Sequence, residues 1–181
     1  MLQITIPGGE FWNEETNKFI NIKETTLVLE HSLVSLSKWE SRWCKPFLGK
    51  ESKTDEETLD YIRCMTLTQN VDPNIYYALS AKNIEDINHY IENPHSATTI
   101  RENNNNSPKS HETITSELIY YWMVALNIPF ECQKWHLNRL LTLIRVCNIK
   151  NAPPKKMTQR QIMSRNAALN AARRKRLNSA G

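Results

Sequence analysis

Acidic residues are absent from the last 50 residues of this chain, the final one being Glu131. The segment 132–181 nevertheless carries twelve of the 23 lysines and arginines. The first 131 residues therefore hold eleven basic and all 19 acidic residues, so a formal charge of −8 precedes a segment of +12. This split predicts an electrostatic partner for the C-terminal segment, namely nucleic acid, an acidic protein surface or the acidic front of a second copy.

Glycine and long apolar runs are also scarce. Four glycines and eight prolines in 181 residues leave few helix breakers. The longest apolar candidate, Leu118–Leu126, is far shorter than the roughly 18–20 residues that span a membrane, and no apolar signal segment is visible at the start. We therefore expect a soluble, mainly helical protein with no membrane partner.

The four cysteines are widely spaced and form no CxxC pair, which indicates free thiols in a reducing cytoplasm. Cys132 and His136 are four residues apart and would share one side of a helix there. Cys147 would lie on the same side, but about 16 Å further along, so a single metal ion could not reach both ends. We expect no metal site.

Sequence motifs for catalysis are missing as well. No GxSxG or HExxH pattern surrounds any serine or histidine. The only adjacent glycines, Gly8 and Gly9, follow a proline and lack the helix pattern that a phosphate-binding loop needs behind them. We expect a non-enzymatic protein without a cofactor.

The first 30 residues favour strands. Residues 3–6 alternate in polarity and stop at the turn signal Pro7-Gly8-Gly9, and residues 18–22 and 25–29 are also rich in strand formers. We predict a small β-hairpin or a three-stranded sheet in residues 1–30.

Helical spacing begins at Glu30 and predicts a helix that Pro46 ends. Thr54 and Glu57 have the spacing of a capping box at the start of the next helix. Asp72-Pro73 is a typical helix start, and Ser80 or Asn83 begins another helix. The Asn-rich stretch 101–111 is predicted to be an exposed loop.

Three further helices are predicted towards the C-terminus. Residues 112–127 are apolar nearly all round, which is typical of a helix that is buried centrally or shared with a partner. A second helix is predicted from about Phe130 to Cys147. Beyond Pro153-Pro154, residues 157–177 form a basic helix with a thin apolar stripe that includes Ile162 and Leu169.

The predicted fold class is therefore mainly α. A small N-terminal β element (1–30) precedes a helical core (31–150, with an exposed loop at 101–111) and a basic C-terminal helical arm (151–181). The candidate partner-binding residues are the basic side chains of this arm: Lys155, Lys156, Arg160, Arg165, Arg173, Arg174, Lys175 and Arg176. They would neutralise phosphates, but no interleaved aromatic side chains are present for base stacking, so nucleic acid is the less favoured partner.

Long segments of the chain resemble a family of small proteins of tailed bacteriophages, most of which are described as tail assembly chaperones. The segments 27–48, 57–73 and 114–156 carry the resemblance, and 165–181 matches the basic ending of the family. The resemblance covers nearly the whole chain apart from the Asn-rich loop.

This resemblance implies a non-enzymatic role in the host cell cytoplasm during phage assembly. A tail assembly chaperone would bind the tape measure protein and the tail-tube protein, and would shield apolar helices until the tube forms around them. The opposite charges of the two halves further suggest head-to-tail self-association, since a heterologous contact can propagate.

Two other functions remain open at this stage. The first is a structural virion protein of the capsid, neck or tail whose basic arm binds DNA or a neighbouring subunit. The second, which is less favoured, is a nucleic-acid-binding regulator, whose binding would weaken strongly with salt.

Overall fold

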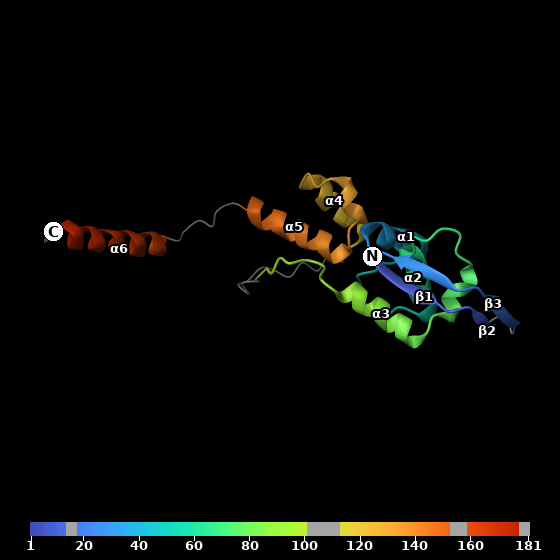
Figure 1. The fold of residues 1–181 in the computed structure, drawn as a ribbon. Coiled ribbons are helices and arrows are strands. Elements are labelled where there is room, and N and C mark those ends of the chain that lie inside the picture. Colours follow the sequence, from blue (N-terminus) through green and yellow to red (C-terminus); the bar gives the residue numbers. More distant parts are fainter. Residues whose placement is uncertain (14–17, 101–112, 153–158, 178–181) are drawn as a thin grey trace. The chain divides into compact units, whose positions relative to one another are not determined.

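The computed structural model describes residues 1–13, 18–100, 113–152 and 159–177. The protein is mainly helical, with small antiparallel strand pairs at the N-terminus, as predicted (Figure 1). The chain divides into two compact units, Met1–Asn148 and Ile149–Gly181, and the strands belong to the first of them. The predicted loop 101–111 lies outside the described residues.

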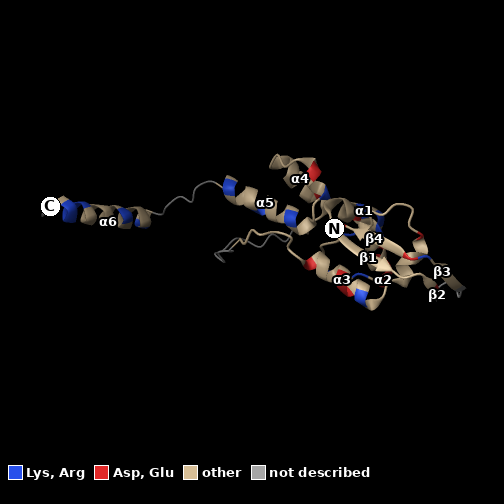
Figure 2. Cartoon of the chain, in the orientation of Figure 1, with Lys and Arg blue, Asp and Glu red and all other residues tan. Residues whose placement is uncertain are grey.

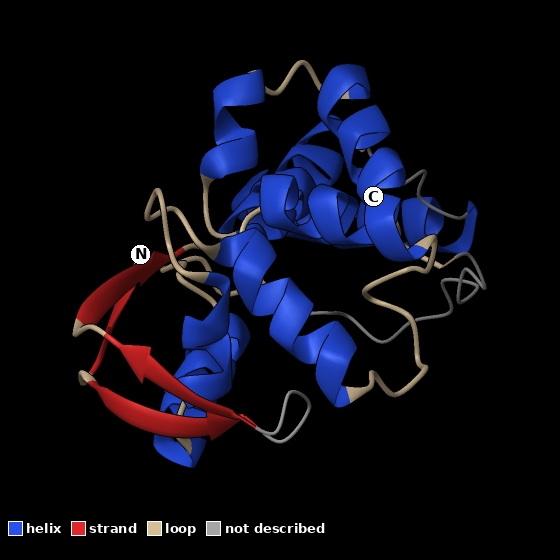
Figure 3. Cartoon of the chain, turned by 90° about the vertical axis from the view of Figure 1, so that its right-hand side faces the viewer, coloured by secondary structure: helices blue, strands red, loops and turns tan. Residues whose placement is uncertain are grey.

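Four strands form two antiparallel pairs. β1 (Leu2–Ile6) pairs with β4 (Thr25–Leu29), and β2 (Gly9–Asn13) pairs with β3 (Lys18–Ile22). The two pairs follow one another as a bent ribbon (Figure 3). Alternate residues of β1 and β4 face the core, as the period of a strand requires.

The turn predicted at Pro7-Gly8-Gly9 is instead a bend, after which pairing resumes in β2. A Cβ on Gly8 would lie 2.9 Å from the backbone nitrogen of Glu24 and 3.2 Å from the carbonyl oxygen of Ile22. Glycine therefore permits a close approach of two backbones that any larger residue would prevent. The structure has four strands in two pairs rather than three in one sheet.

Three of the helices of the first half start at predicted capping residues, while Ser32, the cap of α1, was not predicted. The helix predicted from Glu30 is α1 (Leu33–Trp43), which begins after Ser32 and ends before Pro46 is reached. α2 (Asp55–Met65) has the predicted capping box of Thr54 and Glu57. Asp72 caps η1 (Pro73–Ala78), which is a 3₁₀ helix, and Ser80 caps α3 (Ala81–Glu92).

The second half contains α4 (Ser116–Ala125), η2 (Phe130–Lys134) and α5 (Leu137–Asn151). The single helix predicted from Phe130 to Cys147 is wrong, because the chain breaks at Trp135 and His136. There the backbone of His136 forms an isolated antiparallel β-bridge with that of Ser32, and the backbone N–H of Leu137 donates to the carbonyl of His31 at 2.7 Å. A backbone contact more than 100 residues away in sequence thus replaces one helical turn.

Two apolar clusters form the interior of the first unit. One lies between β1, β4, α2, η1 and α3, and includes Trp39 from α1. The other joins α4, η2 and α5 to Leu33 and Leu36 of α1. Since α1 supplies side chains to both clusters, it is the element that holds the two halves of the unit together.

The second unit contains α6 (Gln159–Leu177), which corresponds to the predicted basic helix 157–177; residues 157 and 158 lie outside the described residues. None of its 19 residues is buried. Core packing therefore does not account for the sequence of α6, so its role must lie in the side chains that it exposes.

Candidate functional site

One side of α4 is covered and the other side is apolar and exposed. Ile119 and Met123 are buried in the second cluster, where α4 packs against α1. Tyr121 and Val124 lie on the opposite side, with 66% and 60% of their surface exposed. The sequence predicted a helix that is either central or shared with a partner, and the exposed side favours the second alternative.

The exposed apolar side continues from α4 onto η2. Tyr120 and Val124 are four residues apart and so are neighbours on the helix surface. The ring centroid of Tyr120 lies 6.4 Å from that of Phe130, which is 52% exposed. We call Tyr120, Tyr121, Val124 and Phe130 the α4–η2 surface. Exposed apolar patches of this kind mark interaction sites.

A buried carboxylate fixes the position of α4. Glu40 of α1 accepts hydrogen bonds from the backbone N–H of Phe47 at 2.8 Å and from that of Ser116 at 2.7 Å. Ser116 is the first residue of α4, where backbone N–H groups have no partner within the helix. Glu40 therefore satisfies one of these groups and orients the exposed side of α4.

The hydroxyl of Tyr120 is also held. It donates to Oε1 of Gln133 in η2 at 2.9 Å, which joins the two elements of the α4–η2 surface. Partial burial raises the pKa of Tyr120 above its ordinary value, so the side chain is neutral and apolar over the physiological range.

The predicted partner-binding residues of the arm are brought together on α6 where the structure describes them. Arg160, Arg165 and the run from Arg173 to Arg176 lie on this one helix, whose residues are all exposed. Figure 2 shows basic and no acidic residues along it. Lys155 and Lys156 lie outside the described residues.

A separate basic cavity lies on the outer side of α1 and α2. It has a volume of about 610 Å³ and is lined by Lys38, Ser41, Arg42, Arg63 and Cys64. Arg42 is paired with Asp60, which also accepts from the indole N–H of Trp43 at 2.9 Å. The spacing of Lys38, Ser41 and Arg42 places them on one face of a helix, a signal that the sequence analysis did not use.

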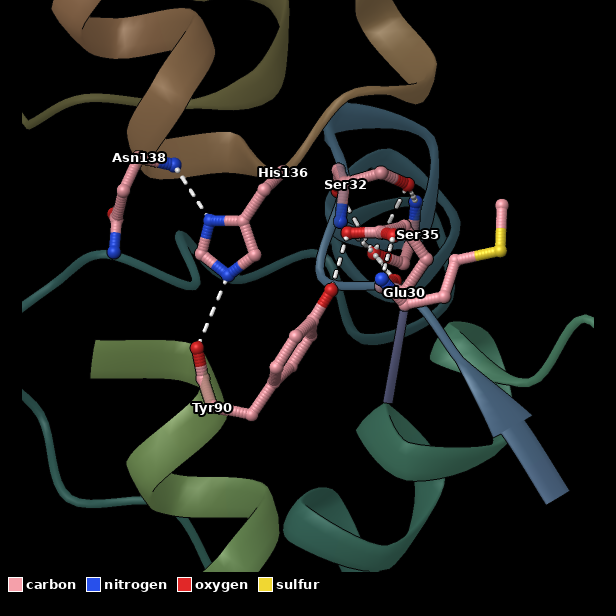
Figure 4. Close-up of polar contacts among 7 residues, drawn as sticks. Glu30, Ser32, Ser35, Tyr90, His136 and Asn138 are labelled. Carbon is pink, nitrogen blue, oxygen red and sulfur yellow. Dashed lines mark hydrogen bonds and ion pairs between the residues drawn. The ribbon is translucent and has the colours of Figure 1, made fainter. Parts of the chain in front are cut away.

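A buried polar cluster joins the two halves of the first unit, and Figure 4 shows its members Glu30, Tyr90 and His136. His31 lies 2.6 Å, Nδ1 to hydroxyl, from Tyr61, and its ring centroid is 5.1 Å from that of His136. The hydroxyl of Tyr90 donates to Oε1 of Glu30 at 2.9 Å. All five side chains are buried, so they link β4, α2, α3 and the start of α5 from within.

Both buried histidines are neutral. Nε2 of His136 donates to the carbonyl of Tyr90 at 3.1 Å, and its Nδ1 accepts from the backbone N–H of Asn138 at 3.3 Å (Figure 4). Burial, with His95 beside it, lowers the pKa of His136. Burial and the two neighbouring histidines lower the pKa of His31 to about 3. The two histidines therefore join the halves through hydrogen bonds of neutral rings, whereas Glu30 forms an ion pair with the N-terminal amine of Met1 at 3.2 Å.

The cysteines do not combine into a ligand set. Cys64 and Cys132 are buried, Cys147 is half-buried and Cys44 is exposed, and none forms a disulfide. Burial raises the pKa of Cys64 and of Cys132 above the ordinary thiol value. Because the helix breaks at Trp135, Cys132 and His136 do not share the helix face that their spacing predicted. The described part of the chain brings no three potential metal ligands together.

Among the described residues, no helix has the length and apolarity needed to cross a membrane.

Comparisons with models of protein families, with curated proteins and with solved structures gave no match.

Proposed function

We propose that this chain is a tail assembly chaperone of a tailed bacteriophage. It binds the tape measure protein, tail-tube subunits or both while the tail is built in the host cytoplasm, and it acts by binding rather than by catalysis. The proposal rests on the resemblance of the sequence segments and on the surfaces described above.

The α4–η2 surface is the observation that carries the proposal. Tyr121 and Val124 expose apolar area on α4, whose opposite side is buried in the second cluster, and Phe130 of η2 adds to this area. An amphipathic partner helix buries its apolar stripe against such a surface. Large aromatic side chains supply much of the binding free energy at protein interfaces. A chaperone of tape measure helices needs this kind of surface.

The basic arm supports recruitment in a second way. α6 presents Arg160, Arg165 and the run 173–176 without a single acidic side chain. Charges at the rim of an interface mainly raise the association rate and make it dependent on salt. A chaperone that must leave its client benefits from an attraction of this reversible kind.

Co-expression with the tape measure protein of the same phage tests the proposal. Pull-down is expected to recover the two proteins together, and the double variant Tyr121→Ser, Val124→Ser is expected to recover at least tenfold less tape measure protein. Leu67→Ser is the matched control, because it also removes an exposed apolar side chain, but from outside the α4–η2 surface. Failure of wild-type protein to capture the tape measure protein and tail-tube subunits would refute the proposal.

A chain that ends at residue 156 tests the arm separately. We expect weaker capture than with the full chain, and the difference should disappear at high salt because screening removes the contribution of α6. Capture that does not change on deletion would show that the arm has no part in recruitment.

The exposed run Arg173–Arg176 also favours a second candidate, a virion protein whose arm binds DNA or a neighbouring subunit. Mass spectrometry of purified virions separates the two functions. A chaperone is absent from the finished particle, whereas a structural protein is present at a fixed copy number.

A further inference from the structure

The groove between α2 and α3 has an apolar floor. It encloses a cavity of about 220 Å³, and its apolar lining consists of Phe47, Tyr61 and Ile62 together with Ile84, Ile87 and Ile91 of α3. Ile62 and Ile87 are buried, while Ile84 and Ile91 are partly covered. The floor is therefore continuous with the core but remains open to an incoming side chain.

The rim of this groove is acidic on both helices. Asn88 lines the groove, and Glu85 and Glu92 are three and four residues from it, which makes both of them its neighbours on α3. On α2, Thr58 also lines the groove, and Asp55 is three residues from it, so Asp55 is its neighbour on the helix surface. All three acidic side chains are exposed, and no ion pair to any of them is found within the described part of the chain.

One basic residue also lies at the groove. The amine of Lys53 is held over the Phe47 ring, 4.3 Å from its centroid. Its charge acts on Glu57 of α2, and no ion pair joins it to Glu85 or Glu92 within the described residues. The α3 side of the groove therefore attracts a cation.

α6 has the complementary pattern. Ile162 and Leu169 are seven residues apart, so they lie on one face of the helix, and they are 45% and 46% exposed. Arg173 is four residues beyond Leu169, and Arg176 is seven beyond it, so both extend the same face. The face thus presents aliphatic side chains beside guanidinium groups, which matches an apolar floor with an acidic rim.

We propose that the α2–α3 groove receives α6 of a second copy of this chain. Ile162 and Leu169 enter the groove as anchors, and Arg173 and Arg176 pair with Glu85 and Glu92. Each copy then offers one groove and one arm, so the contact is heterologous and can add further copies head to tail. This contact is independent of the tail protein that the chain binds.

Sedimentation velocity of the purified full chain tests the contact without any phage partner. At an ionic strength of about 0.01 M, where charges act over about 30 Å, the sedimentation coefficient is expected to rise with protein concentration. At about 1 M, where they act over about 3 Å, it should fall towards the monomer value. A monomer at every concentration in low salt would overturn the proposal.

Charge reversal locates the contact. The variant Glu85→Lys, Glu92→Lys is expected to remain monomeric in low salt. Glu10→Lys, Glu24→Lys is the matched control, since it changes the net charge equally at two exposed sites outside the groove, and it should associate as wild type does. Equal association of both variants would contradict the assignment to the groove.

Mixing two variants gives the sharpest test. Arg173→Ala, Arg176→Ala is expected to be monomeric alone, and it alters only residues of α6, none of which is buried. Mixed with Glu85→Lys, Glu92→Lys, it should form a 1:1 dimer that does not grow further. The arginine arm of one variant then matches the acidic groove of the other, whereas the alanine arm carries no charge that could pair with the lysines. Absence of that dimer, or protection of α6 from proteolysis in a strictly monomeric sample, would exclude a second copy as the occupant.

Discussion

His31 and His136 lie where the two apolar clusters of the first unit meet, and their environment keeps both uncharged. The pKa of His31 is lowered to about 3 and that of His136 is lowered in the same direction, first of all because burial disfavours the charged ring. Tyr61, Tyr90 and Glu30 pack around them, and the ring of the exposed His95 lies tilted against that of His136, with 4.1 Å between the ring centroids. Protonation would therefore place a charge inside the joint between the halves.

Stability is expected to fall as the pH decreases below about 6.5. There the unfolded chain binds a proton at His31 that the folded chain does not bind, so the free energy of unfolding decreases with falling pH. From pH 6.5 to 5, His31 alone accounts for about 2 kcal/mol. Urea unfolding at several pH values measures this slope, which should be smaller in His31→Gln and unchanged in His89→Gln, whose side chain is exposed on α3. Equal slopes in all three proteins would contradict the neutral state of His31.

Glu40 allows a second test at the level of one residue. Glu40→Gln keeps one carbonyl oxygen but turns an amide donor towards the backbone N–H of Phe47 or Ser116. We expect a loss of about 1–3 kcal/mol in the free energy of unfolding, because a buried donor is left unpaired. Glu117→Gln, an exposed change in the first turn of α4, should stay within about 0.5 kcal/mol of wild type. Similar values for both variants would show that Glu40 does not anchor α4.

Local signals predicted those elements whose ends are decided by neighbouring residues. The pair Thr54 and Glu57 marks the start of α2, and Asp72-Pro73 marks that of η1, because each cap acts within three residues. The break at Trp135 was missed because it depends on Ser32 and His31, far away in sequence. β2 was missed for a different reason: its partner β3 begins only five residues after Asn13, but the turn signal Pro7-Gly8-Gly9 was interpreted as the end of the strand.

The candidate site shows the same limit. Apolar residues all round 112–127 indicated a helix that is buried centrally or shared with a partner, but the sequence does not say which side stays exposed. That choice depends on the contact between Glu40 and Ser116, which are 76 residues apart. Tyr121, Val124 and Phe130 were consequently not among the predicted site residues, whereas the basic residues of the arm were predicted from their charge alone.

The bend between the two strand pairs gives a prediction for an element. Gly8→Ala would push a Cβ to within 2.9 Å of the Glu24 backbone, so we expect a loss of about 1–3 kcal/mol as the ribbon is forced apart. Gly9→Ala is the matched control, because its Cβ would meet only the Phe11 ring at an ordinary 3.6 Å. Chemical unfolding of both variants measures the difference. If Gly9→Ala costs as much as Gly8→Ala, close backbone approach is not what requires glycine there.

At the scale of the whole molecule, the acidic and basic parts of the sequence correspond to separate elements of the structure. The acidic side chains lie in the first unit, some of them on the rim of the α2–α3 groove, whereas the acid-free segment comprises η2 after Glu131, α5 and the exposed helix α6. The chain thus offers an apolar surface on α4 and η2 and a charged helix on its arm. Two separate surfaces suit a protein that holds a client through one and its own copies through the other.

Amide hydrogen exchange of the chain, with and without the tape measure protein, shows whether the α4–η2 surface binds this client. Binding is expected to slow exchange in Ser116–Ala125 and Phe130–Lys134, and the Tyr121→Ser, Val124→Ser variant should show no such protection. The strands β2 and β3, which carry other exposed aromatic residues, should exchange as in the free protein. Protection confined to the strands, with α4 and η2 unchanged in a verified complex, would show that the client does not bind at the α4–η2 surface.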